Sequence, residues 1–278
     1  MSDIGIFKFG RNKVLWRLTP KNYIDTFRLL NYGGKFSVDW GDGTIIEYAA
    51  NIGGAVVPTG IITITSDDDN LTRITVGRGV GENRAINAEV VYCGSMTSFE
   101  DSFRDQELTS FSINDTSGIT NWDYAFENIT ELTSFPSNLD TSGGTSFDYA
   151  FARCTAITDF PAIDISSTTT LKNAWRNCSS LTSFPLIDTS AVTDFSGAWS
   201  DCGLTSFPLL DTGAGTNFSG AWRNCASLSS FPALDFSSGQ IFSFAWKECA
   251  GLTSFPSSCG FTSATTMGGA FSESGLAS

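Results

Sequence analysis

The stretch FSGAWSDCGLTSFP at residues 195–208 decides the fold, because near copies of it recur along the chain. Its second half, LTSFP or a near copy, recurs at offsets of 24, 25, 24, 23, 24 and 24 residues, beginning at Leu108, Leu132, Ile157, Leu181, Leu204, Leu228 and Leu252. Similarity at a fixed period of this kind is typical of architectures in which each unit buries its apolar face against its neighbours. The sequence therefore predicts a solenoid over residues 91–278, built from repeats of about 24 residues.

The first half of the repeat follows the pattern aromatic-x-x-Ala-aromatic-x-x-Cys. Its apolar positions fall at i, i+3, i+4 and i+7, which is the stripe of one helix face, so we expect about two helical turns in each repeat. We expect LTSFP to form a short strand that ends at its proline. Stacking would then produce structural columns of equivalent side chains, namely Cys154, Cys178, Cys202, Cys225 and Cys249, and Trp175, Trp199, Trp222 and Trp246.

Residues 1–90 do not repeat and alternate in polarity, as in residues 36–40, 61–65 and 71–76, which is typical of β-strands. The run VDWGDGT at residues 38–44 places Asp-Gly at a tight turn, a strong hairpin signal. We expect a small antiparallel sandwich over residues 19–90. Residues 1–18 interleave aromatic and basic side chains and are interpreted as an added strand or a docking arm.

Composition limits the possible chemistry. The chain has 16 Lys and Arg against 29 Asp and Glu, a net charge of −13, which argues against nucleic acid or an anionic membrane as a partner. It contains no histidine, which excludes Ser-His-Asp and Cys-His nucleophile pairs and imidazole metal ligands. No window approaches the roughly 18 apolar residues that a membrane span needs. We therefore expect a protein that is not an enzyme, binds no cofactor and does not span a membrane.

Three sets of residues invite a metal or catalytic interpretation. The cysteines recur at the repeat length and not as C-x-x-C, so a buried thiol column is preferred over a metal cluster. Recurrent aspartates (Asp115, Asp140, Asp164, Asp188, Asp211 and Asp235) could bind a cation or act as acid and base, but a turn cap is the preferred interpretation. Asp39, Asp42 and Asp67 to Asp69 lack the ligand spacing of an EF-hand, so turns are preferred over a calcium site.

Hydroxyl side chains recur in the LTSFP segments and form the candidate recognition face. We expect one member of each pair to point out of a flat sheet, where the hydroxyls could bind glycan, order water as ice-binding surfaces do, or only keep the surface hydrated. The candidate residues are Thr133, Thr158, Thr182, Ser183, Thr205, Ser206, Ser229, Ser230, Thr253 and Ser254.

The segments AWSDCGLTSFP and AWRNCASLSSFP resemble BspA-type leucine-rich repeats, and TSAVTDF at residues 189–195 is similar to the related repeats of Mycoplasma lipoproteins. The run VDWGDGT resembles PKD-like immunoglobulin-fold modules. These resemblances imply an adhesive surface protein whose repeat domain follows a sandwich. Many relatives carry methionine where this chain carries an aromatic residue.

These observations predict a non-enzymatic structural or adhesion protein of a virion, from a bacteriophage: a tail fibre, a receptor-binding protein or a capsid decoration protein. The N-terminal region would attach to other virion or surface-assembly proteins, and the repeats would recognise a host glycan or protein. The first residues do not resemble a secretory signal, which favours a virion over the alternative, a bacterial cell-surface adhesin. A polysaccharide-acting enzyme is a further alternative. The last repeat has no polar cap, so we expect an oligomer.

Overall fold

The computed structural model describes residues 14–20, 27–49, 54–56, 58, 61–66, 71–76, 85–93, 96–113 and 116–277. Within these ranges the protein is mainly β, with nine strands and no helix. The prediction of short helices in the repeats is therefore wrong. Residues 1–13, Asp67 to Asp69 and Asp115 lie outside the described residues.

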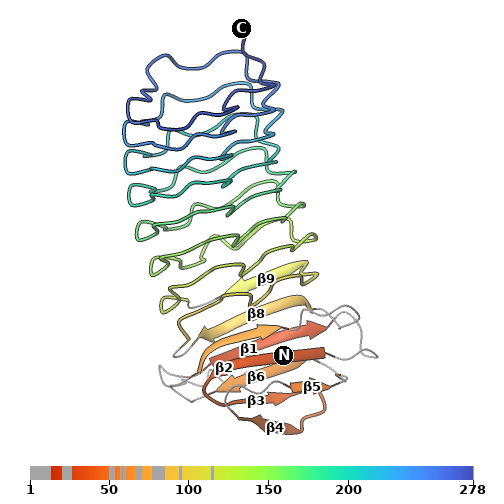
Figure 1. Ribbon diagram of the computed structural model, residues 1–278. Helices are drawn as coiled ribbons and strands as arrows, with labels where there is room; N and C mark the ends of the chain where they lie inside the picture. Colours follow the sequence, from red (N-terminus) through yellow and green to blue (C-terminus); the bar gives the residue numbers. More distant parts are fainter. Residues whose placement is uncertain are drawn as a thin grey trace.

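Two sheets make up the N-terminal part (Figure 1). The larger has the strand order β4-β3-β6-β1-β8-β9 and the smaller the order β5-β2-β7. All neighbouring strands are antiparallel except β8 and β9, so the larger sheet is mixed. The strands are β1 (Val14–Pro20), β2 (Phe27–Gly33), β3 (Phe36–Asp39), β4 (Ile45–Tyr48), β5 (Gly54–Val56), β6 (Ile62–Ser66), β7 (Leu71–Val76), β8 (Ala85–Cys93) and β9 (Ser110–Ile113).

Strands β3 and β4 form the hairpin expected at Asp42-Gly43. Gly41 and Gly43 have φ angles of 99° and 82°, which glycine adopts without steric penalty. The Asp39 carboxylate accepts the N–H groups of both glycines, and Asp42 accepts that of Thr44. These two carboxylates therefore close the turn itself.

The larger sheet connects the N-terminal strands to the repeats. β8 spans the boundary expected between residues 90 and 91, and it pairs in parallel with β9, which belongs to the first repeat. Ser102 strengthens this junction, since its hydroxyl donates to Ile74 O at 2.7 Å and its carbonyl accepts Val76 N–H at 3.0 Å. Arg73 and Glu100 form an ion pair across the same junction. One buried apolar cluster runs through both parts.

After β9 the chain winds in coils that lie one on the next, up to the C-terminal end of the molecule (Figure 1). Each coil corresponds to one sequence repeat. Seven isolated parallel bridges join neighbouring coils through Ser98, Asn121, Ser146, Thr170, Asp194, Asn217, Ile241 and Thr266. Each of these residues directly precedes the first apolar position of the aromatic-x-x-Ala motif, so this point of the repeat holds the stack in register.

The segment predicted to be helical forms turns whose N–H groups point alternately in two directions. In the coil of Trp199, the N–H groups of residues 195, 197, 199 and 201 donate to the next coil, at 2.7–2.9 Å. Those of residues 198, 200 and 202 donate three residues back along the chain. Gly197 and Asp201 have φ angles of 62°, which no α-helix contains. The residues at positions i, i+3, i+4 and i+7 still face inward, but they lie on turns whose N–H groups donate to the next coil.

The LTSFP segments also differ from the prediction, since only the first copy is a strand. That copy, residues 108–112, reads LTSFS and has Ser112 where the other six copies have proline. Proline has no N–H to donate and is disfavoured inside a ladder. The substitution therefore explains why β9 forms while no other described LTSFP segment is assigned as a strand.

Candidate recognition surface

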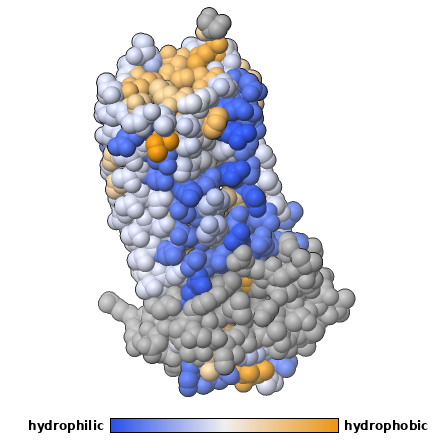
Figure 2. All heavy atoms as spheres, viewed as in Figure 1, coloured by the Kyte–Doolittle hydropathy of each residue, from blue (hydrophilic) through white to orange (hydrophobic). Residues whose placement is uncertain are grey.

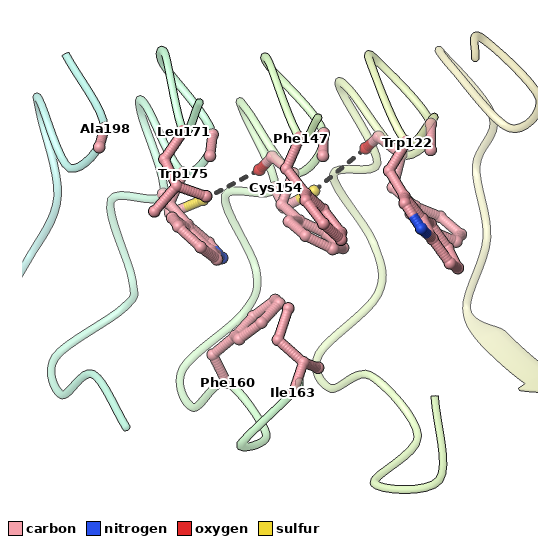
Figure 3. Close-up of a cluster of buried hydrophobic side chains, with 14 of the residues drawn as sticks. Trp122, Phe147, Cys154, Phe160, Ile163, Leu171, Trp175 and Ala198 are labelled. Carbon is pink, nitrogen blue, oxygen red and sulfur yellow. Dashed lines mark hydrogen bonds between the residues drawn. The ribbon is translucent and has the colours of Figure 1, made fainter. Parts of the chain in front are cut away.

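Inside the stack, aromatic rings at equivalent positions of successive coils lie one above the other, and we call these columns aromatic files. The rings of Trp175, Trp199, Trp222 and Trp246 lie nearly parallel in successive coils, with centroids 5.9, 5.6 and 5.2 Å apart. Figure 3 shows the same arrangement for Trp122 and Phe147, whose centroids are 5.7 Å apart. Offset stacking of this kind is favourable beyond the burial of the rings. The files fix the spacing at which every exposed side chain repeats.

The cysteine column lies beside these rings and is fully buried. Each thiol donates to a backbone carbonyl of the preceding coil at 3.0–3.2 Å, as the dashed line from Cys154 in Figure 3 shows. Burial raises the pKa of Cys154, Cys202 and Cys225 well above the ordinary value, and that of Cys249 to about 12. A protonated thiol is neither a nucleophile nor a metal ligand. In the part of the chain that the structure describes, no group of three metal-ligating side chains occurs.

The recurrent aspartates form an exposed acidic file: Asp140, Asp164, Asp188, Asp211 and Asp235. Each carboxylate accepts the backbone N–H two residues further on, at 2.8–3.1 Å. Donation from the following serine, through its N–H and its hydroxyl, holds the pKa of Asp164, Asp188 and Asp235 below the ordinary value. All members of the file thus close the same kind of turn, and Asp164, Asp188 and Asp235 are ionised at neutral pH.

A threonine follows the aspartate in several coils and ties one coil to the next. The buried hydroxyls of Thr116, Thr141, Thr189 and Thr212 donate at 2.5–2.6 Å to the carbonyl of the aspartate in the following coil. In two coils an apolar residue, Ile165 or Phe236, takes this buried place. The two residues therefore have different roles: the aspartate carboxylate closes the turn within its own coil, and the threonine hydroxyl bonds to the next coil.

All ten residues of the candidate recognition face are exposed. Both members of each pair are exposed, and Thr205 and Ser206 lie at a bend of the chain, so the expected flat sheet with one hydroxyl outward is wrong. Two hydroxyls are partly used within the stack, because Thr205 donates to Thr182 O at 3.3 Å and Ser229 donates to Thr205 O at 3.2 Å. The pairs line one edge of the stack, coil after coil.

A second hydroxyl file was missed by the sequence analysis. It consists of threonines two residues before the first apolar position of six repeats, whose hydroxyls donate to the preceding coil at 3.0–3.5 Å: Thr120, Thr145, Thr169, Thr193, Thr216 and Thr265. Their recurrence at the repeat spacing is visible in the sequence and could have identified the file.

A charged stripe was missed as well. All six lysines and arginines of residues 96–278 lie between the first aromatic position and the cysteine position of a repeat. Five of the six form ion pairs between coils, among them Arg223 with Glu248 at 3.3 Å and Arg104 with Glu127 at 2.6 Å. The Glu127 side chain is only 5% exposed and also lies 3.5 Å from Arg153. On the face seen in Figure 2, hydrophilic residues form a band along the stack.

Comparison with protein families, with curated proteins and with solved structures finds no match to this chain. The described part of the chain contains no helix long and apolar enough to cross a membrane. The geometry alone therefore carries the functional argument.

Proposed function

We propose that the protein is a non-enzymatic recognition protein, in which a leucine-rich-repeat-like solenoid binds the ligand and an immunoglobulin-like or PKD-like sandwich provides the attachment. One observation carries this proposal: exposed polar side chains recur at the coil spacing, whereas the thiols of the cysteine column are buried. A surface of this kind suits a ligand that itself repeats along its length.

The likeness of the carboxylates within the acidic file supports a binding role for this surface. General acid and base catalysis by two carboxylates needs two unlike environments, so that one is protonated while the other is ionised. Each member of the acidic file accepts the backbone N–H two residues further on, and the pKa shifts found among them are all downward. A polysaccharide-acting enzyme is correspondingly disfavoured, and incubation with candidate polysaccharides should release no shorter products.

The ligand class follows from charge. Residues 96–278 contain six basic and 19 acidic residues, and 6 − 19 = −13, which equals the net charge of the whole chain. A surface this acidic repels polyanions, which disfavours nucleic acid as a ligand. We propose an uncharged host-surface glycan or a protein as the ligand of the hydroxyl pairs.

Substitution of the hydroxyl pairs tests this assignment. We expect the triple variant Thr182→Glu, Thr205→Glu and Thr253→Glu to lose binding to host cells or arrayed glycans, because bulky charges would cover the edge of the stack. The matched control is Thr145→Glu, Thr169→Glu and Thr193→Glu, which places the same charges on the second hydroxyl file. Equal binding by both variants, with unchanged circular dichroism, would remove the candidate recognition face from consideration.

For the location we propose a virion, with a bacterial cell surface as the alternative. The N-terminal sheets lie at the opposite end of the molecule from the last coil, which leaves the repeats free to project from a particle (Figure 1). Mass spectrometry of purified particles tests this proposal: the protein should copurify with them at constant stoichiometry. Recovery in cell-envelope fractions alone would favour the adhesin.

A further inference from the structure

An apolar ridge runs along the stack beside the acidic file. It consists of Ala162, Leu186, Leu209 and Ala233, one from each of four successive coils, all exposed. Leu186 and Leu209 are 70% and 64% exposed, among the highest values for large apolar side chains in the described part of the chain. The two exposed leucines occupy equivalent places in neighbouring coils, and apolar side chains that gather on a surface mark interaction sites.

The ridge and the acidic file are parallel and adjacent. In each of the four coils the aspartate follows the ridge residue by two positions, and the residue between them is buried, as Ile187 is between Leu186 and Asp188. The ridge residue and the aspartate are thus both exposed, on either side of one buried residue. One flank of the ridge is therefore lined by carboxylates at the coil spacing.

These carboxylates have no basic partner on their own surface. Residues 177–222, which include Leu186, Asp188, Leu209 and Asp211, contain no lysine or arginine. None of the ion pairs within the described ranges involves the acidic file. The bonds from the following serines keep Asp164, Asp188 and Asp235 ionised. The ridge is thus an apolar strip beside unneutralised negative charge.

We propose that this ridge binds a cationic amphipathic α-helix of a partner protein, lying along the axis of the stack. The buried rings beneath the ridge repeat at 6.2 Å from Phe184 to Phe207 and at 5.8 Å from Phe207 to Phe231. Side chains on one face of a helix recur at about 5–6 Å, so each helical turn meets one coil.

The length and charge of the partner helix follow. Four coils correspond to about four helical turns, or about 14 residues, with an apolar stripe on the ridge and lysines or arginines over the acidic file. A second copy of this chain is a poorer occupant, because its repeats also carry the net charge of −13. The proposal rests on the proposed function only in that the molecule acts by binding.

A synthetic peptide tests the proposal. The probe is a fluorescently labelled peptide of about 15 residues with leucine and lysine at helical spacing, and its binding is measured by anisotropy. The first control is a peptide of the same composition, shuffled so that no apolar stripe forms. We expect only the patterned peptide to bind tightly, and its binding to weaken as NaCl increases.

Variants of the protein locate the site. We expect Leu186→Ser with Leu209→Ser to raise Kd at least about tenfold, the change expected for roughly one leucine burial. Asp188→Asn with Asp211→Asn should also raise Kd, because it removes two negative charges beside the ridge. The amide oxygen of asparagine can still accept the N–H bond that closes the turn. The control Ile241→Ser alters an exposed isoleucine outside the ridge and should leave Kd unchanged.

Three results would overturn the proposal: equal binding of the shuffled peptide, unchanged Kd in the double leucine variant, or self-association that this variant abolishes. The last would make a second copy the occupant. Glycan or cell binding by the double leucine variant is measured in parallel. If that binding persists while the peptide fails to bind, the docking proposal fails and the proposed function stands.

Discussion

The tryptophans of the stack contribute shape and not hydrogen bonding. The indole N–H groups of Trp175, Trp199, Trp222 and Trp246 are buried with no hydrogen-bond acceptor within reach. Phenylalanine occupies the same place in three earlier coils, at Phe103, Phe126 and Phe151, and stacks in the same files. A buried donor without an acceptor is costly, so the ring itself must be the reason for tryptophan.

Substitution at Trp199 should therefore depend on size. We expect Trp199→Ala to lower the free energy of unfolding by about 3–5 kcal/mol, because it opens a cavity between Trp175 and Trp222. Trp199→Phe should cost only about 1–2 kcal/mol, since it keeps a ring and removes the unbonded N–H. Urea unfolding followed by far-UV circular dichroism measures both. Similar costs for the two variants would contradict the size argument.

The thiols of the cysteine column should be inert in the folded protein. With the pKa of Cys249 at about 12, almost no thiolate exists at pH 8, and the reagent DTNB requires the thiolate. We expect the five column cysteines to react only after unfolding in urea. Cys259, whose sulfur lies 3.8 Å from its carbonyl partner, should react earlier. Rapid reaction of Cys202 in native protein, located by mass spectrometry, would refute the prediction.

At the scale of the repeat element, sequence periodicity predicted which side chains face inward but not the backbone path. Phe195, Ala198, Trp199 and Cys202 are all buried, as a helix would also require. The spacing could not separate a helix from turns of similar pitch. Gly197 and Asp201 tolerate the positive φ found there, but Tyr149 and Phe244 adopt it at the place of Gly197 in other coils, so residue type alone could not reveal the turns.

The candidate site shows the same limit. The acidic file and the hydroxyl pairs were found from repetition alone, and each lies in register as repetition requires. The charged stripe and the apolar ridge were missed because their residue types change from coil to coil, as from Ala162 to Leu186. Only the stacked coordinates bring such unlike residues into one line.

Two aspartates of the repeat element should respond to pH in opposite ways. Burial raises the pKa of Asp148, although its carboxylate accepts the Thr170 hydroxyl and Lys172 N–H. Its ionised form is therefore unfavourable in the folded state, and Asp148→Asn should stabilise the protein at pH 7. This gain should disappear as the pH falls through the raised pKa to the ordinary value of 3.8.

Asp164→Asn is the matched control. Donation from Ser166 lowers the pKa of Asp164, so its ionised form stabilises the fold above pH 3.8, and that stability is lost as the pH falls through the lowered pKa. The variant should be less stable than the parent at pH 7 and equal to it in strong acid. Urea midpoints from pH 2.5 to 7 measure both differences. The same sign for the two variants at pH 7 would contradict the assignment.

At the scale of the whole molecule, each coil contacts mainly its two neighbours, so stability should be a sum of like interfaces. Deletion of residues 205–228 removes 24 residues, one whole repeat, and joins Leu204 to Ser229 in register. We expect this variant to fold, with parent-like circular dichroism and a slightly lower melting temperature. Deletion of residues 205–216 removes half a repeat and should abolish cooperative unfolding. Failure of both deletions would indicate that the coils are not interchangeable.

The coil-to-coil hydrogen bonds have an evolutionary consequence. Because every second N–H in the turn segment is donated to the next coil in the same direction, a newly inserted copy would find its partners already in place. Unequal crossing-over between near-identical gene segments could then lengthen or shorten the stack without a new folding solution. The length of the stack, and with it the distance to which the last coil projects, would then change by mutation in steps of one coil.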